Sequence, residues 1–484
     1  MKTINIYRFL VIAVFLAIGS GCEKDLQPYS SKSDANALAT PADLQTATYG
    51  VYGRIKVSEF VLEQWWTSIY ADDDVALSGQ TSNPIWNTYN YAHLANAFNM
   101  EYFWRSSYKA IFSANLIMEK ITDGTSPTLD QLKGENLYIR ALCHFFMVRF
   151  FGRPYPQGNG ENPGIPIKDN TKDDLPSRNT VKEVYDFVIA DLLKAAELMT
   201  VSKNSCFASK ETCYALLSRI YLYKEDYLNA IKYANMVIDS KRYSLVGTEA
   251  FKKYFIPVPE NNPETIFAIR HVPTDNRAKS AIGNQFYNAP VGSTGYAETY
   301  VSQTLVDMLL RYPEDARNSF IEPQREADGR MKMRGLVPKY YMNKYNWQDG
   351  IANLSSPVVS RLAEMYLIRA EVNAKLGNDQ LAIDDVNLIR SRAGLSGTAL
   401  YTVDDLKGHT SVLNVVLEEK RLEFYMEGHR CFDLFRNNLP MVRNYVGWHG
   451  TDHLNFRVEP TSLRVVQFLP EREIVANPNL VQNP

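Results

Sequence analysis

The sequence predicts a mainly α-helical fold in which two similar helix pairs flank a long irregular segment. The pairs occupy residues 208–243 and 361–394. In both stretches small or apolar residues recur at intervals of three and four, the period of one helix face. Between them, in residues 250–358, this period fades while Pro and Gly accumulate. We therefore expect paired helices that carry a loop-rich insertion.

The later pair shows the helical pattern most clearly. One face of each predicted helix is lined by small or apolar residues: Leu362, Tyr366, Ala370 and Ala374 in the first, and Ala382, Val386, Ile389 and Ala393 in the second. Gly377 and Gly394 stand where a residue in the left-handed conformation would close each helix.

The earlier pair aligns with the later one position by position. Tyr214 falls on Tyr366, Ser218 on Ala370, Ala230 on Ala382, Ala234 on Val386 and Val237 on Ile389. Small residues at these positions let two helices approach closely, which is typical of tetratricopeptide repeats. Two unrelated amphipathic hairpins are the alternative, and the matched register favours the repeat.

Further elements are predicted from local signals. Thr40, Pro41 and Asp43 form a capping box with proline at the first helical position. The expected elements are a helix from there to about Ile55, helical spacing from Trp104 to Asn115, helices over Leu129–Phe151 and Val181–Met199, and a short strand over Glu264–Arg270. We expect the folded part to divide into residues 41–249, 250–358 and 359–484.

The N-terminus has the pattern of a secretory signal peptide over residues 1–21. Lys2 and Arg8 precede an apolar run that is too short to span a bilayer, and small residues stand before Cys22. This resembles a bacterial lipoprotein signal, so we expect acylation of Cys22 and a flexible tether over residues 22–40. A plain secreted protein is the alternative.

Composition excludes several classes of protein. Net charge is −2, and we find no basic patch interleaved with aromatics, so nucleic acid is not an expected partner. The five cysteines form no CxxC pair, which argues against a zinc site or a disulfide framework. The chain has no Gly-rich phosphate loop, HExxH or nucleophile elbow, so we expect neither a cofactor nor catalysis.

A charged helix is predicted over Ser411–His429. Glu419 falls inside its apolar stripe and Glu423 beside the stripe's edge. A carboxylate on an apolar face must be paired or neutral. The expected partners are the charged residues that follow directly: Arg430, Asp433 and Arg436. A pair of glutamates acting in general acid/base catalysis is the alternative, and the ion-pair network is favoured.

At these residues the chain resembles the SusD/RagB family. The run EKRLEFYMEGHRCFDLFR (419–436) and the ending LPEREIVANPNLVQNP (469–484) are similar to that family's C-terminal motifs. The resemblance extends through RLAEMYLIRAE, the repeat at Ala208, ENLYIRALCHFFMVRFFGRPYP and the lipoprotein start, and thus over essentially the whole chain.

The resemblance implies a non-enzymatic outer-membrane lipoprotein of Bacteroidota that faces the cell exterior. Family members cap a SusC-like TonB-dependent transporter and capture glycans or, in the RagB branch, peptides. Their fold is a scaffold of tetratricopeptide-like helix pairs with a less regular ligand-binding part. From other functional classes, a surface glycoside hydrolase and a helical-repeat adaptor remain as less favoured alternatives.

Ligand residues are expected where aromatic and amide side chains alternate. Sugars are held by exposed aromatic faces together with Asn, Asp, Gln or Arg side chains. Two stretches fit: Asn83, Trp86, Asn87 and Tyr89 in the first, and Tyr296, Tyr300 and Trp347 in the second. A structural role is the alternative for each ring. Asp72, Asp73 and Asp74 could hold Ca²⁺, although a solvated or capping run is favoured.

Overall fold

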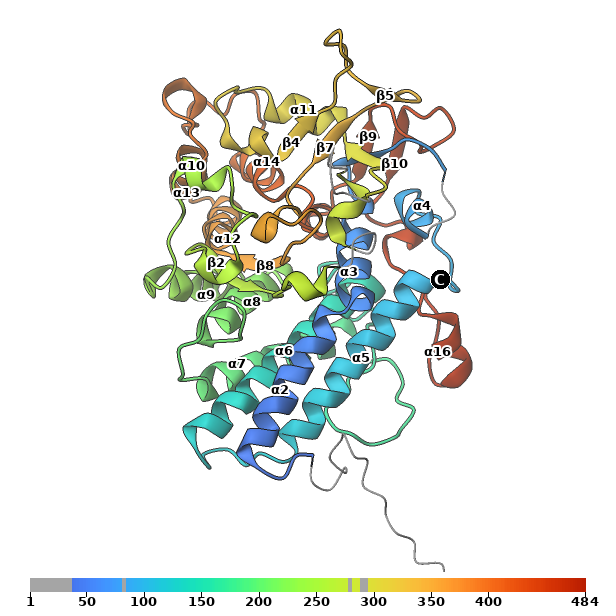
Figure 1. Ribbon diagram of the computed structural model, residues 1–484, viewed down its shortest axis with the longest axis vertical. Helices are drawn as coiled ribbons and strands as arrows, with labels where there is room; N and C mark the ends of the chain where they lie inside the picture. Colours follow the sequence, from blue (N-terminus) through green and yellow to red (C-terminus); the bar gives the residue numbers. More distant parts are fainter. Residues whose placement is uncertain (1–36, 81–83, 277–280, 288–294) are drawn as a thin grey trace, which may run out of the picture. The chain divides into compact units, whose positions relative to one another are not determined.

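The computed structural model describes residues 37–80, 84–276, 281–287 and 295–484. The predicted signal peptide, Cys22, most of the tether and Asn83 lie outside these ranges. Helices dominate the described part, which confirms the predicted mainly α class (Figure 1). None of the helices described combines the length and apolar character that crossing a membrane requires.

The α-helices range from short turns to a 25-residue helix. They are α2 (Pro41–Lys56), α3 (Ser58–Tyr70), α4 (Pro84–Tyr89), α5 (Phe98–Met118), α6 (Pro127–Phe151), α7 (Val181–Leu198), α8 (Lys210–Tyr223), α9 (Tyr227–Asp239), α10 (Thr248–Phe251), α11 (Gln303–Leu309), α12 (Leu362–Lys375), α13 (Asp379–Arg392), α14 (Val412–Phe424), α15 (Arg430–Arg436) and α16 (Glu471–Ala476).

The strands are short and form two-stranded antiparallel ladders. The pairs are β1 (Val75–Leu77) with β3 (Thr299–Val301), β2 (Thr265–Ala268) with β8 (Val358–Arg361), β4 (Ile321–Pro323) with β7 (Tyr340–Met342), β5 (Met333–Arg334) with β6 (Val337–Pro338), and β9 (Met441–Asn444) with β10 (Asn455–Val458). Most of them lie in residues 250–358, together with short helical turns and loops.

The predicted capping box at Thr40 is present, and a second one opens α7. Within residues 37–44, the hydroxyl of Thr40 accepts a hydrogen bond from the Asp43 amide at 3.2 Å, and the Asp43 carboxylate accepts one from the Thr40 amide at 3.1 Å. Thr180 and Glu183 make the same reciprocal pair at the start of α7. Each box satisfies backbone donors that the first helical turn leaves unpaired.

In residues 45–484 the longer helices pack in chain order. α5 lies against α6, α6 against α7, α7 against α8, and α8 against α9. The next neighbour of α9 is α12, so the two predicted helix pairs lie side by side although residues 240–361 separate them in sequence. Ala370, Ala382 and Val386 form part of the buried cluster of the later pair, as their spacing predicts. Gly377 and Gly394 have φ of 76° and 92°, which confirms the predicted left-handed helix ends.

The charged helix is shorter than predicted. α14 ends at Phe424 instead of continuing to His429. Side chains from other segments take the carbonyl groups that further helical turns would use: Arg361 donates to Glu423 O at 2.8 Å, Lys344 to Tyr425 O at 2.9 Å, and Tyr345 to Met426 O at 2.7 Å. The chain therefore turns before α15 begins.

This early end changes the partners of the two glutamates. Both are buried and paired, as predicted, but the expected partners are wrong. Glu419 is held by Arg317 at 2.6 Å and Arg390 at 2.9 Å, and Glu423 is held by Arg361 and Arg392. The residues expected as partners lie beyond the turn, where Arg430 pairs with Asp73 and Arg436 pairs with Glu371 and Asp433.

Candidate ligand-binding face

The structure brings the two predicted ligand-binding stretches together. β1 follows α3 and pairs with β3, so Ala76 lies opposite Tyr300 although more than 200 residues separate them. The loop between β9 and β10 lies against β1, because Tyr445 donates through its hydroxyl to Val75 O at 2.7 Å and Trp448 through its amide to Leu77 O at 2.9 Å. Three distant parts of the chain thus meet at one place.

A cluster of tyrosines supports this junction. The rings of Tyr300 and Tyr341 stack with centroids 5.9 Å apart, and Tyr287 meets Tyr341 edge-on at 5.7 Å. Trp347 contacts Tyr287 edge-on at 6.3 Å. Tyr445 belongs to the same buried cluster. Offset and edge-to-face ring pairs of this kind hold aromatic side chains in fixed orientations.

The predicted residues differ in how far they reach solvent. The Tyr296 side chain is 48% exposed, and Trp86, Asn87 and Trp347 are partly exposed. In contrast, Tyr89 and Tyr300 are completely buried. These two rings offer no face to a ligand in this structure, so their contribution is to position neighbouring residues of the site.

Tyr89 has a clear positioning contact. Its hydroxyl is 2.8 Å from Nδ1 of His449, in the loop between β9 and β10. Burial, and then Arg443, lowers the pKa of His449 to about 4, so this imidazole is neutral at neutral pH. The contact ties α4 to the loop that carries Trp448.

Trp448 is the residue of this site that the sequence interpretation missed. Its side chain is 38% exposed and stacks on His453, with ring centroids 4.3 Å apart. The Asn90 side-chain amide donates to the carbonyl of Trp86 at 3.0 Å and to that of Trp448 at 3.4 Å, which places the two tryptophans near each other. The aromatic and glycine-rich run YVGWHGTDH (445–453) is the signal that could have indicated it.

We call Trp86, Tyr296, Trp347 and Trp448 the aromatic face. Polar groups accompany it: Arg334 pairs with Glu298 at 3.2 Å, and Ser78 donates to the carbonyl of Glu298. Apolar ring faces beside hydrogen-bonding side chains match the two sides of a sugar, its C–H face and its rim of hydroxyls.

The acidic triplet that follows α3 is buried, so the favoured interpretation of it as a solvated run is wrong. Asp72, Asp73 and Asp74 are buried. Arg421 pairs with Asp74 at 2.7 Å and Arg430 with Asp73 at 2.9 Å. Although burial opposes it, Arg421 and Arg430 hold the pKa of Asp73 well below its usual range. Burial, followed by the charges of Asp74 and Asp73, raises the pKa of Asp72.

Calcium would have to compete with these guanidinium groups for the same oxygens. Across the part of the chain that the structure describes, no group of three or more His, Cys, Asp or Glu side chains is arranged to hold a metal ion. The triplet therefore acts as a buried anchor that ties the end of α3 to α14 and α15.

Glu423 lacks the environment of a general acid. A catalytic acid needs a raised pKa so that it still carries its proton near neutral pH. Although burial opposes it, Arg392, Arg361 and Arg317 hold the pKa of Glu423 well below its usual range. Its charge is therefore committed to the ion pairs of the scaffold.

Comparison with known proteins agrees with this architecture. Residues 24–222 match the family described as "Starch-binding associating with outer membrane", and residues 321–484 match the family described as "SusD family". A SusD-like protein P38 of Formosa agariphila is 25% identical over an alignment of 530 positions, gaps included. The alignment covers 99% of this chain and 98% of that protein. The starch-binding protein SusD of Bacteroides thetaiotaomicron is 23% identical over 410 residues, which cover 69% of this chain and 68% of that protein.

Solved structures share the whole architecture. A SusD superfamily protein from Bacteroides thetaiotaomicron superposes with a TM-score of 0.81 at 25% identity, covering 92% of this chain and 100% of that one. The helix pairs, the irregular segment and the C-terminal motifs are therefore found together in known relatives. The chain belongs to the SusD/RagB family.

Proposed function

We propose that this protein captures oligosaccharides or polysaccharides at the cell surface and passes them to a SusC-like TonB-dependent transporter. The observation that carries the proposal is the aromatic face, in which Trp86, Tyr296, Trp347 and Trp448 surround one rigid junction. Family membership and the starch binding named for one relative agree with it.

The proposed mechanism is binding without chemistry. Sugar rings would stack on the exposed parts of the aromatic face while Asn87 and the Glu298–Arg334 pair orient their hydroxyls. Stacking on one aromatic ring contributes about 1–3 kcal/mol, by analogy with base stacking. Several weak contacts then bind a polymer while allowing it to leave for the transporter.

The proposed location is the outer membrane, with the protein facing the cell exterior. A lipid anchor on Cys22 would hold it there, since each buried methylene of an acyl chain contributes about 0.8 kcal/mol. The residues up to 40 would then act as the tether. A peptide ligand, as in the RagB branch, is the alternative that the binding experiment must separate.

Affinity electrophoresis against a panel of plant and host polysaccharides tests the proposal. We expect one polymer to retard the protein, and Trp448→Ala to weaken that binding about 5- to 150-fold, which corresponds to the loss of one stacking contact. Trp86→Ala and Trp347→Ala should act in the same direction.

Phe112→Ala is the matched control, because Phe112 is an exposed aromatic on α5 outside the aromatic face. If each of the three tryptophan variants is still retarded as strongly as the unmodified chain, glycan capture remains supported and the aromatic face is refuted as the binding site. Binding of peptides, with no retardation by any polysaccharide, would instead establish the RagB-like function.

A further inference from the structure

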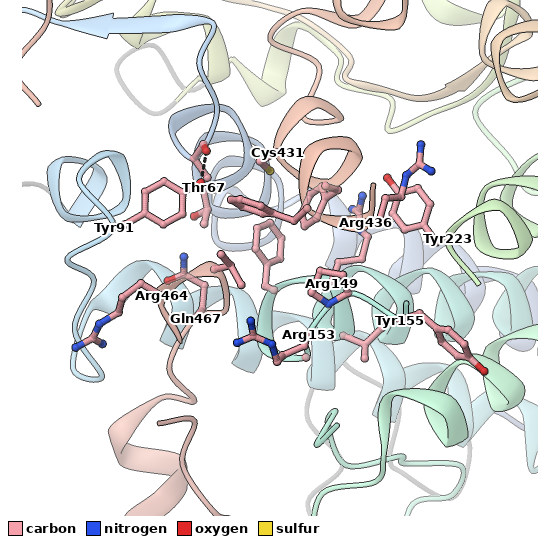
Figure 2. Close-up of a pocket in the computed structure, with 18 of the residues that line it drawn as sticks. Thr67, Tyr91, Arg149, Arg153, Tyr155, Tyr223, Cys431, Arg436, Arg464 and Gln467 are labelled. Carbon is pink, nitrogen blue, oxygen red and sulfur yellow. Dashed lines mark hydrogen bonds between the residues drawn. The ribbon is translucent and has the colours of Figure 1, made fainter. Parts of the chain in front are cut away.

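A small cavity that none of the aromatic-face residues lines lies where α3, α6 and α15 meet the C-terminal segment (Figure 2). Its volume is about 40 Å³. A buried water needs roughly 10–15 Å³ on this measure, so the cavity has room for about three waters or one small polyatomic ion. Among the described residues that line it there are four arginines and no aspartate or glutamate: Arg149, Arg153, Arg436 and Arg464.

Arg149 is the least compensated of these arginines. Its side chain is 9% exposed, and its Nε has no hydrogen-bond acceptor among the described residues. Burial lowers its pKa, and the strongest electrostatic influences on it come from Tyr223, Arg219, Tyr185 and Cys431, none of which is a carboxylate. A buried guanidinium without an anionic partner is rare, because desolvating an unpaired charge is costly.

Aromatic rings compensate part of this charge. The central carbon of the Arg149 guanidinium lies 4.4 Å from the centroid of Phe146 and 4.3 Å from that of Phe432. Such cation–π contacts stabilise the charge. They do not replace the oxygen acceptors that the guanidinium N–H groups require, because these donors are directed in the plane of the group.

Other donors surround the same space, and the hydroxyl of Tyr223 is one that has no acceptor among the described residues. Figure 2 shows Arg149, Arg436 and Tyr223 on one side of the pocket and Tyr91, Arg464 and Gln467 on the other. The Tyr223 hydroxyl is buried and has no partner in the described part of the chain. It is therefore available to donate to an acceptor in the cavity.

The remaining arginines differ in availability. Arg436 is committed to Glu371 and Asp433, each at 2.6 Å. Arg153 donates to Gln157 at 2.9 Å and to backbone carbonyls of Pro460 and Ser462, which leaves its charge uncompensated by these neutral groups. Arg464 is exposed and packs over Phe468, so it can meet an anion arriving from solvent.

We propose that this cavity binds one small oxyanion, a sulfate or a carboxylate. Arg149 and Tyr223 hold the anion, and the charges of Arg153 and Arg464 attract it to the cavity. The cavity shares no lining residue with the aromatic face, and the proposal does not depend on glycan capture. The oxyanion is either a free ion or the acidic substituent of a sugar, and the two sources differ in a measurable way.

Thermal unfolding of the purified full chain tests the site. Sodium sulfate, acetate and glucuronate are titrated up to 20 mM against chloride at constant ionic strength, so that general salt effects cancel. We expect a saturable rise in melting temperature with sulfate or acetate, because a ligand that binds only the folded state stabilises it. Glucuronate binding at least about tenfold tighter than acetate would identify an acidic sugar as the source, and equal binding would identify the free ion.

Variants connect the effect to the cavity. Arg149→Met should abolish the saturable rise, and Tyr223→Phe should weaken it about tenfold while keeping the ring. Arg153→Gln gives a third measurement if Arg149→Met fails to fold. Arg457→Gln is the matched control, because Arg457 is exposed and pairs with Glu459 outside the cavity.

Two results would overturn the proposal. One is an equal melting temperature in sulfate, acetate and chloride for the unmodified chain. The other is an unchanged anion effect in Tyr223→Phe and Arg153→Gln, which would show that the cations lining the cavity do not hold the anion.

Discussion

Replacing Arg361 by methionine should lower the free energy of unfolding by about 3–5 kcal/mol, the usual cost of removing one partner from a buried ion pair. Arg361 is 2% exposed and donates to Glu264 at 3.2 Å, to Glu427 at 3.1 Å, and to Glu423. It is also the residue through which β8 contacts the end of α14.

The magnitude follows from the charge balance of the surrounding cluster. Ion pairs connect five buried carboxylates with five buried cations: Asp315, Glu264, Glu419, Glu423 and Glu427 with Arg317, Lys344, Arg361, Arg390 and Arg392. Removing Arg361 leaves one excess negative charge. Glu423 keeps Arg392 and Glu427 keeps Lys344, so the cost is that of one broken pair and not of three.

Equilibrium urea unfolding, followed by circular dichroism at pH 7.5 and pH 5.5, measures the effect. Arg361 is one of the charges that lower the pKa of Glu423 against burial, so without it we expect burial to raise the folded-state pKa of that carboxyl above its unfolded value. Protonation then stabilises the folded variant as the pH falls, so the loss relative to the unmodified chain should be smaller at pH 5.5 than at pH 7.5.

The double variant Arg361→Met/Glu427→Gln is the matched control, because it restores equal numbers of charges. It should recover at least about half of the stability that Arg361→Met loses. A loss below about 1 kcal/mol for Arg361→Met, or losses that simply add in the double variant, would refute the view that charge balance holds this cluster together.

Two further changes test local features of the scaffold. Burial, and then Glu59, raises the pKa of Glu63 to about 8. The stability that the protonated carboxyl contributes is therefore present below about pH 4 and lost as the pH rises toward 8. We expect the melting temperature to fall less between pH 5 and pH 8 in Glu63→Gln than in the unmodified chain. Gly394→Ala should lower the free energy of unfolding in urea by about 1–3 kcal/mol, and by more than Gly377→Ala does. Both glycines have positive φ, so both substitutions strain the backbone. A Cβ at Gly394 would also lie 3.1 Å from Thr248 Cγ2 and 3.3 Å from Glu314 O, whereas one at Gly377 meets nothing within 4 Å.

The helical scaffold could be predicted because its signals are local. The apolar period, the capping boxes at Thr40 and Thr180, and the closing glycines at 377 and 394 each lie within a few residues of the feature that they determine. The helical spacing predicted from Trp104 onward is confirmed, because Trp104 lies in α5 and is buried.

The partners of Glu419 and Glu423 could not be predicted in the same way. Sequence distance favoured Arg430 and Arg436, but α14 stops at Phe424 because Arg361, Lys344 and Tyr345 capture the carbonyls that follow. Those three residues are 62 to 81 positions away in the sequence. The end of this helix is thus set by tertiary contacts, for which the local sequence carries no signal.

In the candidate site, too, local patterns predict some residues and tertiary contacts determine the others. The alternation of rings and amides predicts Trp86, Tyr296 and Trp347 as ligand residues, but it carries no signal for which of the predicted rings are buried. Tyr300 lies on β3 and is buried, whereas Tyr296 lies just before that strand and is exposed. Trp448 was missed because its role depends on contacts with β1 and α4, more than 350 residues upstream.

The ion-pair cluster and the aromatic face are mechanically connected. Lys344 and Tyr345 hold the end of α14 from the same short segment that presents Trp347. Both side chains are almost fully buried, so this segment is fixed before any ligand arrives. A preorganised face loses little conformational entropy on binding, so a few weak stacking contacts would suffice for the proposed glycan capture. The buried charges make no contact with the aromatic face, and we expect them to support the proposed binding by fixing the backbone from which Trp347 projects.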